Sequence, residues 1–196
     1  CSLCEACAND CVTGFKPSEY IREARTLAVA NGFEPTGVTK AMKNLMEKNN
    51  IYGDTANAEI LELIDELPEK ASILLYLGQT GAAREFSTGK AMIQILKKAG
   101  VDFTVLREEP VSGAFLNELM GYVGEVQQQA EKTAKVMLAI GAKTIVVLNP
   151  HDACIFKNQY MAWGLLPDTE VITATAYLAK LIADGILQVH KVKKTA

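Results

Sequence analysis

The chain lacks several features that would define a class of protein. The 196-residue sequence contains no apolar run of the roughly 18–20 residues that a membrane-spanning helix needs. Its first residues do not have the pattern of a signal peptide. Neither sign of charge dominates, because 20 Lys and Arg stand against 23 Asp and Glu, which excludes a general attraction for nucleic acid or anionic lipid. Glycine-rich nucleotide-binding patterns are also missing. We therefore expect a cytoplasmic protein with no membrane span and no nucleic-acid partner.

Cysteine is rare, and its placement is informative. Four of the five cysteines are Cys1, Cys4, Cys7 and Cys11, while Cys154 lies alone far downstream. An odd number packed in this way argues against a secreted disulfide framework and for metal ligation in a reducing compartment. Spacers of two, two and three residues are typical of thiolates that bind a [4Fe–4S] cluster. Zinc sites prefer two Cys-x-x-Cys pairs separated by a longer loop, so zinc and disulfides are the weaker alternatives.

The fourth cysteine has two possible roles. In two-cluster ferredoxins the last cysteine of such a run ligates the other cluster, and a proline usually follows it, whereas Val12 follows Cys11 here. Either all four cysteines bind one cluster, or Cys11 serves a second cluster whose remaining ligands come from elsewhere. Both arrangements remain open at this point.

Composition divides the chain near residue 70 into two units. Residues 1–70 carry a net charge of −5 and residues 71–196 a net charge of +2. In the first unit apolar residues recur at helical spacing, which predicts a small helical module. Its helices are expected at 17–31, at 38–46 and from the N-cap candidate Asp54 to 67.

The second unit alternates between apolar strands and helices. Strands are expected at 72–77, 102–106, 144–148 and 171–173. Helices are expected at 87–99, 115–140, 157–163 and 175–183. Continuous apolar strands that alternate with helices predict an α/β fold with a doubly wound, mostly parallel sheet.

Polar residues follow several of the predicted strands. Open parallel sheets place their sites at the carboxyl ends of strands, so Gln79, Ser112, Asn149, His151 and Asp152 are expected to converge there. They could form a small polar pocket, or His151 and Asp152 could hold a single hard metal ion. The simpler interpretation is that Asn149 and Asp152 cap the helices that follow.

At this point the residues resemble a known family. The cysteine motif, followed by residues 13–17 and a helix, resembles the helical ferredoxin domain of the iron–sulfur subunits of heterodisulfide reductase and of glycolate or lactate oxidase. The remainder resembles the cysteine-rich domain of the same family at 76–80, 96–103, 149–151 and 157–158. The resemblance implies a [4Fe–4S] ferredoxin-like module at 1–70 and a cysteine-rich-type α/β domain at 71–196.

The second unit departs from that family at its ligands. The five cysteine positions of the family domain fall on Gln79, Val111, Ser112, Asn149 and Asp152. None of these side chains is a soft anionic donor of the kind that iron–sulfur clusters require. We therefore expect the second unit to bind no cluster and to reduce no disulfide.

Taken with the cysteine motif, the resemblance implies a redox subunit rather than a self-sufficient enzyme. It implies an iron–sulfur electron-transfer subunit, with the cluster on Cys1, Cys4, Cys7 and Cys11. The expected partner is another subunit of a hetero-oligomeric oxidoreductase, carrying a flavin or an iron–sulfur cluster. Two alternatives remain: a structural subunit that holds a complex together, and a small-molecule-binding domain that uses the strand-end site.

Overall fold

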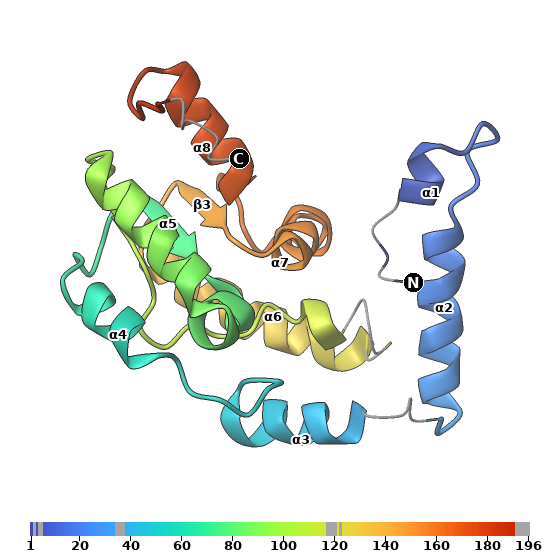
Figure 1. The fold of residues 1–196 in the computed structure, drawn as a ribbon. Helices are drawn as coiled ribbons and strands as arrows, with labels where there is room; N and C mark the ends of the chain where they lie inside the picture. Colours follow the sequence, from blue (N-terminus) through green and yellow to red (C-terminus); the bar gives the residue numbers. More distant parts are fainter. Residues whose placement is uncertain (2, 4–5, 34–37, 117–120, 122, 191–196) are drawn as a thin grey trace, which may run out of the picture.

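A computed structural model describes residues 1, 3, 6–33, 38–116, 121 and 123–190 of the chain (Figure 1). Its centre is a four-stranded sheet in which every pairing is parallel. The strands are β1 (Ile73–Tyr76), β2 (Phe103–Thr104), β3 (Thr144–Val147) and β4 (Glu170–Thr173). Their spatial order is β2-β1-β3-β4. The chain passes from β1 to its neighbour β2 on one side and from β3 to its neighbour β4 on the other, so the strand order reverses between β1 and β3. A crevice at the carboxyl ends of β1 and β3 is therefore where such sheets bind ligands.

Helices cover both faces of the sheet. Leu74 and Tyr76 of β1 point into one apolar cluster, which α6 (Val123–Ala139) and α7 (Pro150–Ile155) complete. Leu75 points into the opposite cluster, completed by α4 (Ala58–Asp65), α5 (Phe86–Lys98) and α8 (Ala174–Ala183). This alternation along a buried strand confirms the predicted α/β fold with a doubly wound parallel sheet.

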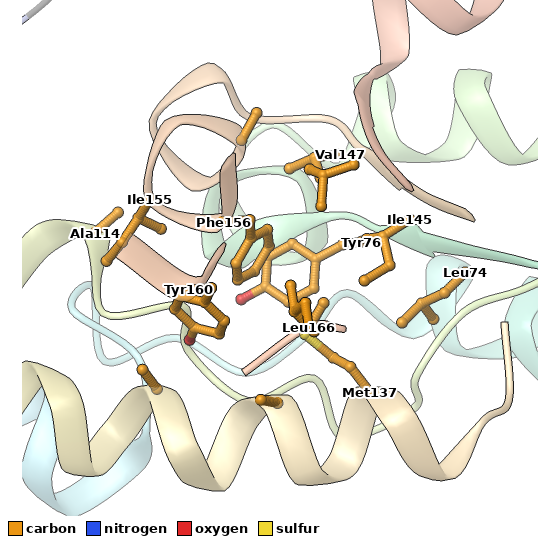
Figure 2. Close-up of a cluster of buried hydrophobic side chains, with 14 of the residues drawn as sticks. Leu74, Tyr76, Ala114, Met137, Ile145, Val147, Ile155, Phe156, Tyr160 and Leu166 are labelled. Carbon is orange, nitrogen blue, oxygen red and sulfur yellow. The ribbon is translucent and has the colours of Figure 1, made fainter. Parts of the chain in front are cut away.

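Aromatic rings fill the first cluster. Figure 2 shows Tyr76, Phe156 and Tyr160 above the helix that carries Met137. The Tyr76 and Phe156 rings meet edge to face with centroids 4.9 Å apart, and Phe156 meets Tyr160 in the same way at 4.8 Å. The Tyr76 hydroxyl donates to the Pro110 carbonyl at 2.6 Å, so the polar end of this buried ring is satisfied. The cluster thereby holds the segment after β2 against the end of β1.

The region before the sheet is helical, as expected. Its helices are α1 (Ala6–Asn9), α2 (Pro17–Ala30), α3 (Val38–Lys48) and α4. Pro17 occupies the first turn of α2, where its missing N–H costs nothing. Ile60 and Ile64 of α4 belong to the core cluster of the sheet. The division of the chain near residue 70 stays a prediction, and α4 packs across it.

Several element boundaries differ from the sequence prediction. The N-cap of α4 is Asn57, whose side chain accepts from the Glu59 N–H at 2.9 Å, and not Asp54. The helix expected at 157–163 begins earlier, because α7 starts at Pro150 and continues into the π-helix η3 (Phe156–Tyr160). β2 is shorter than predicted. Of the expected helix at 115–140, α6 begins at Val123, and residues 117–120 and 122 lie outside the described residues.

One more helix bears on the location of the site. A π-helix, η1 (Thr80–Arg84), begins four residues after Tyr76, the last residue of β1, and leads into α5.

Across the described ranges, every helix is too short or too polar to cross a membrane.

Candidate functional site

Three of the four N-terminal cysteines are described, on and around α1. Cys1 and Cys7 are exposed, and Cys11 is half-buried in the turn after α1. Cys4 lies outside the described residues, so the full set of four sulfurs is not placed. Within the described part of the chain, no three or more His, Cys, Asp or Glu side chains gather as a metal site. The ligand role of the four cysteines therefore stays a prediction.

Polar hydrogens surround the sulfur of Cys11. Its Sγ lies 3.1 Å from the Thr13 hydroxyl oxygen. Hydrogen bonds from this hydroxyl and from the backbone N–H groups of Thr13, Phe15 and Gly14 lower the pKa of the Cys11 thiol, against a smaller opposing effect of burial. The thiolate is the form that binds iron, and N–H groups directed at sulfur are what a bound cluster meets in proteins. The surroundings of Cys11 therefore fit a cluster ligand.

One face of α2 lies beside the same segment. The N-terminal end of the chain lies beside α2 in Figure 1, and the Arg25 guanidinium donates to the Cys1 carbonyl at 2.6 Å. On the same face, Ser18 is only 1% exposed. The Ser18 Oγ and the Arg22 Nε are buried with no hydrogen-bond partner in the described part of the chain. Such orphaned donors fit an anionic acceptor that the chain itself does not supply.

The second candidate region is the carboxyl end of the sheet. A cavity of about 170 Å³ opens there. It is lined by every position at which the family resemblance would place a lost thiol: Gln79, Val111, Ser112, Asn149 and Asp152. His151 lines it as well, so the predicted convergence of polar residues is confirmed. The described residues offer no group of three or more His, Cys, Asp or Glu there, so the metal alternative gains no support.

Polar groups around this cavity bond within the chain. Ser112 donates from Oγ to the Asp152 carboxylate at 2.5 Å and accepts from the Ala114 N–H at 3.1 Å. The Asn149 side chain accepts from the His151 N–H at 2.9 Å, which confirms its predicted capping role. Asp152 was expected to be a cap as well, but it lies inside α7 and is 8% exposed.

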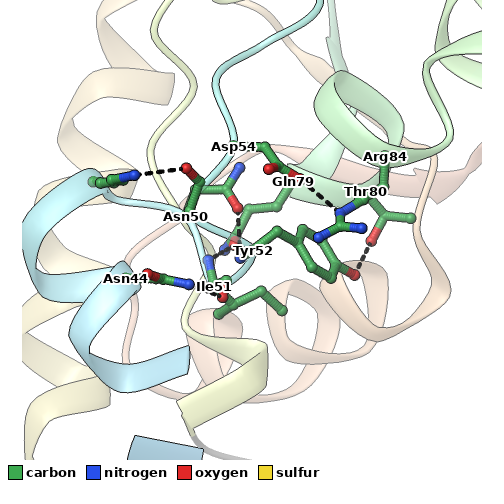
Figure 3. Close-up of polar contacts among 10 residues, drawn as sticks. Asn44, Asn50, Ile51, Tyr52, Asp54, Gln79, Thr80 and Arg84 are labelled. Carbon is green, nitrogen blue, oxygen red and sulfur yellow. Dashed lines mark hydrogen bonds and ion pairs between the residues drawn. The ribbon is translucent and has the colours of Figure 1, made fainter. Parts of the chain in front are cut away.

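A loop from the helical region covers the end of β1. The Ile51 N–H donates to the Gln79 Oε1 at 2.7 Å, and the hydroxyls of Tyr52 and Thr80 lie 3.0 Å apart (Figure 3). The Arg84 guanidinium lies 4.9 Å from the Tyr52 ring centroid and pairs with Asp54 at 2.6 Å. Because these partners are about 28 residues apart along the chain, no periodic pattern in the sequence indicated the contact.

Glu109 closes the other side of the strand end. Its carboxylate accepts from the backbone N–H of Leu77 at 2.7 Å and of Gly78 at 2.6 Å. Burial raises the pKa of Glu109 to about 8, helped by the nearby charge of Asp152 and opposed by these two N–H donors. Glu109 also borders a larger cavity of about 670 Å³ beside the loop after α3. Nothing in the sequence singled out Glu109 as a residue of this strand end.

Glycine allows the close approach of β1 and α7. Gly78 has φ +72°, and a Cβ added there would lie 2.5 Å from the Asp152 Oδ2. Both the left-handed backbone and the contact require that this residue lack a side chain. Asp152 and the loop at Ile51 therefore both approach the chain at the end of β1.

Known proteins similar to this chain are redox proteins. It is 28% identical over 205 residues to the EtfAB:quinone oxidoreductase of Syntrophomonas wolfei, covering 97% of this chain and 28% of that protein. It is 24% identical over 204 residues to the probable iron–sulfur-binding oxidoreductase FadF of Bacillus subtilis, covering 96% and 29%. It is 24% identical over 201 residues to a subunit of the dihydromethanophenazine:CoB–CoM heterodisulfide reductase of Methanosarcina barkeri, covering 98% and 48%. No protein-family model and no solved structure matches it.

These relatives are iron–sulfur oxidoreductase subunits, and the chain is homologous to them along nearly its whole length. The resemblance inferred from the cysteine motif and the strand-end residues is thereby confirmed. The chain spans half or less of the length of these relatives, between 28% and 48%.

Proposed function

We propose that this chain binds a [4Fe–4S] cluster through Cys1, Cys4, Cys7 and Cys11 and transfers electrons within a multi-subunit oxidoreductase. The observation that carries the proposal is the cysteine spacing of two, two and three residues, in a chain homologous to iron–sulfur oxidoreductase subunits. A bound cluster supplies one-electron transfer. The chain's own residues supply thiolate ligands and hydrogen-bond donors.

The surroundings of the cysteines support this role. The hydroxyl and N–H groups around Cys11 favour its thiolate form. Cys1 and Cys7 are exposed, so a partner subunit can approach the segment directly. The net charge of −5 over residues 1–70 favours association with a partner whose facing surface is positive. We propose that this partner is a flavin or iron–sulfur subunit of the same complex.

The test is the metal content of anaerobically prepared protein. We expect about four irons and four sulfides per chain, with visible absorbance and an electron paramagnetic resonance signal on reduction. Cys4→Ser should lose both iron and signal. Cys154→Ser is the matched control, because Cys154 lies in α7 and accepts from the Asn158 amide at 3.3 Å, and it should keep both. Zinc in place of iron, or no metal at all, would contradict the proposal.

The same measurement separates the two roles of Cys11. If all four cysteines bind one cluster, Cys11→Ser should lose iron as Cys4→Ser does. If Cys11 serves a second cluster, that variant should retain the signal of the first. Because serine differs from cysteine by a single atom, the comparison changes the ligand and little else.

For the α/β part we propose a supporting role in assembly, with no chemistry at the strand-end cavity. Supporting this role, Gln79 is bonded to the loop at Ile51, and Ser112 to Asp152. Gln79→Ala should lower the free energy of unfolding by about 1–3 kcal/mol, because the Ile51 amide loses its acceptor, and should leave iron content unchanged. A stoichiometric small molecule released on denaturation and detected by mass spectrometry would favour the ligand-binding alternative instead.

A further inference from the structure

Three polar residues of α2 share one face. Ser18, Arg22 and Arg25 are spaced by four and three residues, which places them above one another on an α-helix. Arg25 locates that face, because its guanidinium donates to the Cys1 carbonyl at 2.6 Å. Leu3, between Cys1 and α1 in the sequence, is 2% exposed, so its side chain is packed against its surroundings.

Two of these residues bury donors that the chain leaves unused. The Ser18 Oγ and the Arg22 Nε have no hydrogen-bond partner among the described residues, and both atoms are buried. Buried donors in folded proteins are almost always paired, because an unpaired one forfeits its hydrogen bonds to water. The guanidinium N–H can only donate, and the hydroxyl can donate as well as accept, so an acceptor satisfies both groups. The positive charge of the guanidinium favours an anionic acceptor.

We propose that Ser18, Arg22 and Arg25 are positioning residues for the iron–sulfur cluster and raise its reduction potential; the inference rests on the proposed function. Sulfur atoms of a thiolate-bound cluster are acceptors that carry negative charge, and they would lie on the segment that this face of α2 contacts. Reduction adds one more negative charge. Hydrogen bonds to sulfur and a nearby cation therefore stabilise the reduced state more than the oxidised state.

The acidic residues of α2 do not cancel this effect. Glu19 is exposed and forms an ion pair with Lys16 at 3.1 Å. Glu23 is exposed too. Each glutamate follows one of the three donor residues by a single position, so neither lies on the face of α2 that those residues share. The half-buried arginines are screened less by solvent than these surface groups, so their charges act more strongly on a neighbouring anion.

The test is a redox titration followed by electron paramagnetic resonance, on the anaerobic full chain. Arg22→Gln should lower the equilibrium constant for one-electron reduction about tenfold, a fall of about 59 mV in potential. Ser18→Ala should lower it by a smaller amount. Arg107→Gln is the matched control: it removes the same charge from an arginine that pairs with Asp65 of α4, and it should leave the potential unchanged.

The outcomes separate this inference from the proposed function. Wild-type protein without iron would contradict the proposed function itself. If Arg22→Gln and Ser18→Ala both bind a full cluster and their reduction potentials equal that of the control, the inference is overturned. If Arg22→Gln loses iron, Arg22→Lys, which keeps the charge but lacks Nε, and Ser18→Ala decide the matter. At least one of these two should then bind a cluster at a lowered potential, and unchanged potentials in both would refute the inference.

Discussion

Replacing Glu109 with glutamine tests how the carboxyl at the end of β1 responds to pH. In the folded chain its pKa is raised from 4.5 to about 8, mainly by burial. Between these two pH values the folded state holds a proton on Glu109 that the unfolded state has released. The folded state is therefore favoured below pH 4.5 and loses this advantage progressively as the pH rises toward 8.

The magnitude follows from the gap between the two pKa values. At about 1.4 kcal/mol for each pH unit, a rise from 4.5 to about 8 sets an upper limit of about 5 kcal/mol. Solvent reaches the half-buried side chain and screens part of this, so we expect about 2 kcal/mol. Glutamine cannot ionise, so Glu109→Gln should gain about that much stability relative to wild type as the pH rises through the window.

Urea unfolding at fixed ionic strength, repeated between pH 4.5 and pH 8, measures the difference between the two proteins. Glu108→Gln is the control, since it removes a carboxylate from the exposed neighbouring residue. Taking differences cancels every other titrating group common to both proteins. A difference between Glu109→Gln and wild type that stays constant across the window would refute the argument that burial outweighs the two N–H donors.

Two substitutions test the packing around the sheet. Gly78→Ala should lower the free energy of unfolding by about 2–4 kcal/mol, since its Cβ would clash with Asp152, whereas Gly100→Ala has a similar positive φ and open space and should cost about 1 kcal/mol. Equal losses in the two would show that the clash is absent. Ile60→Ala should cost about 2–5 kcal/mol, because Ile60 is fully buried in the core of the sheet, whereas the exposed Leu27→Ala should cost under about 0.5 kcal/mol. Chemical unfolding measures both pairs, and a small loss for Ile60→Ala would mean that α4 folds apart from the sheet.

Much of the α/β fold followed from local patterns. Apolar runs such as those around β1 and β3 predict buried parallel strands, and helical periodicity between them predicts the covering helices. The convergence of Gln79, Ser112 and Asp152 also followed, because the carboxyl ends of parallel strands meet at one edge of the sheet. The role of the N-terminal cysteines rests on their spacing and on the homology to iron–sulfur subunits, and it stays a prediction, since Cys4 lies outside the described residues.

Contacts between distant parts of the chain depended on packing that no periodicity encodes. Asp54 was expected to cap α4, but the N-cap is Asn57, whose side chain accepts from the Glu59 N–H. Asp54 instead forms an ion pair with Arg84. The pKa of Glu109 is raised only because folding buries its carboxyl beside Asp152, against the opposing effect of the two backbone N–H donors.

Sequence by itself therefore indicated the class of the protein, through the spacing of the four N-terminal cysteines, the order of strands and helices, and the absence of cysteine at the five positions where the resembled family has it. Such features are local, and a single segment of chain contains the whole pattern. Only the tertiary structure decided which donors are left unused on α2 and which groups approach the chain at the end of β1. Those properties belong to pairs of segments, and burial and hydrogen bonding between them exist only once the segments have packed.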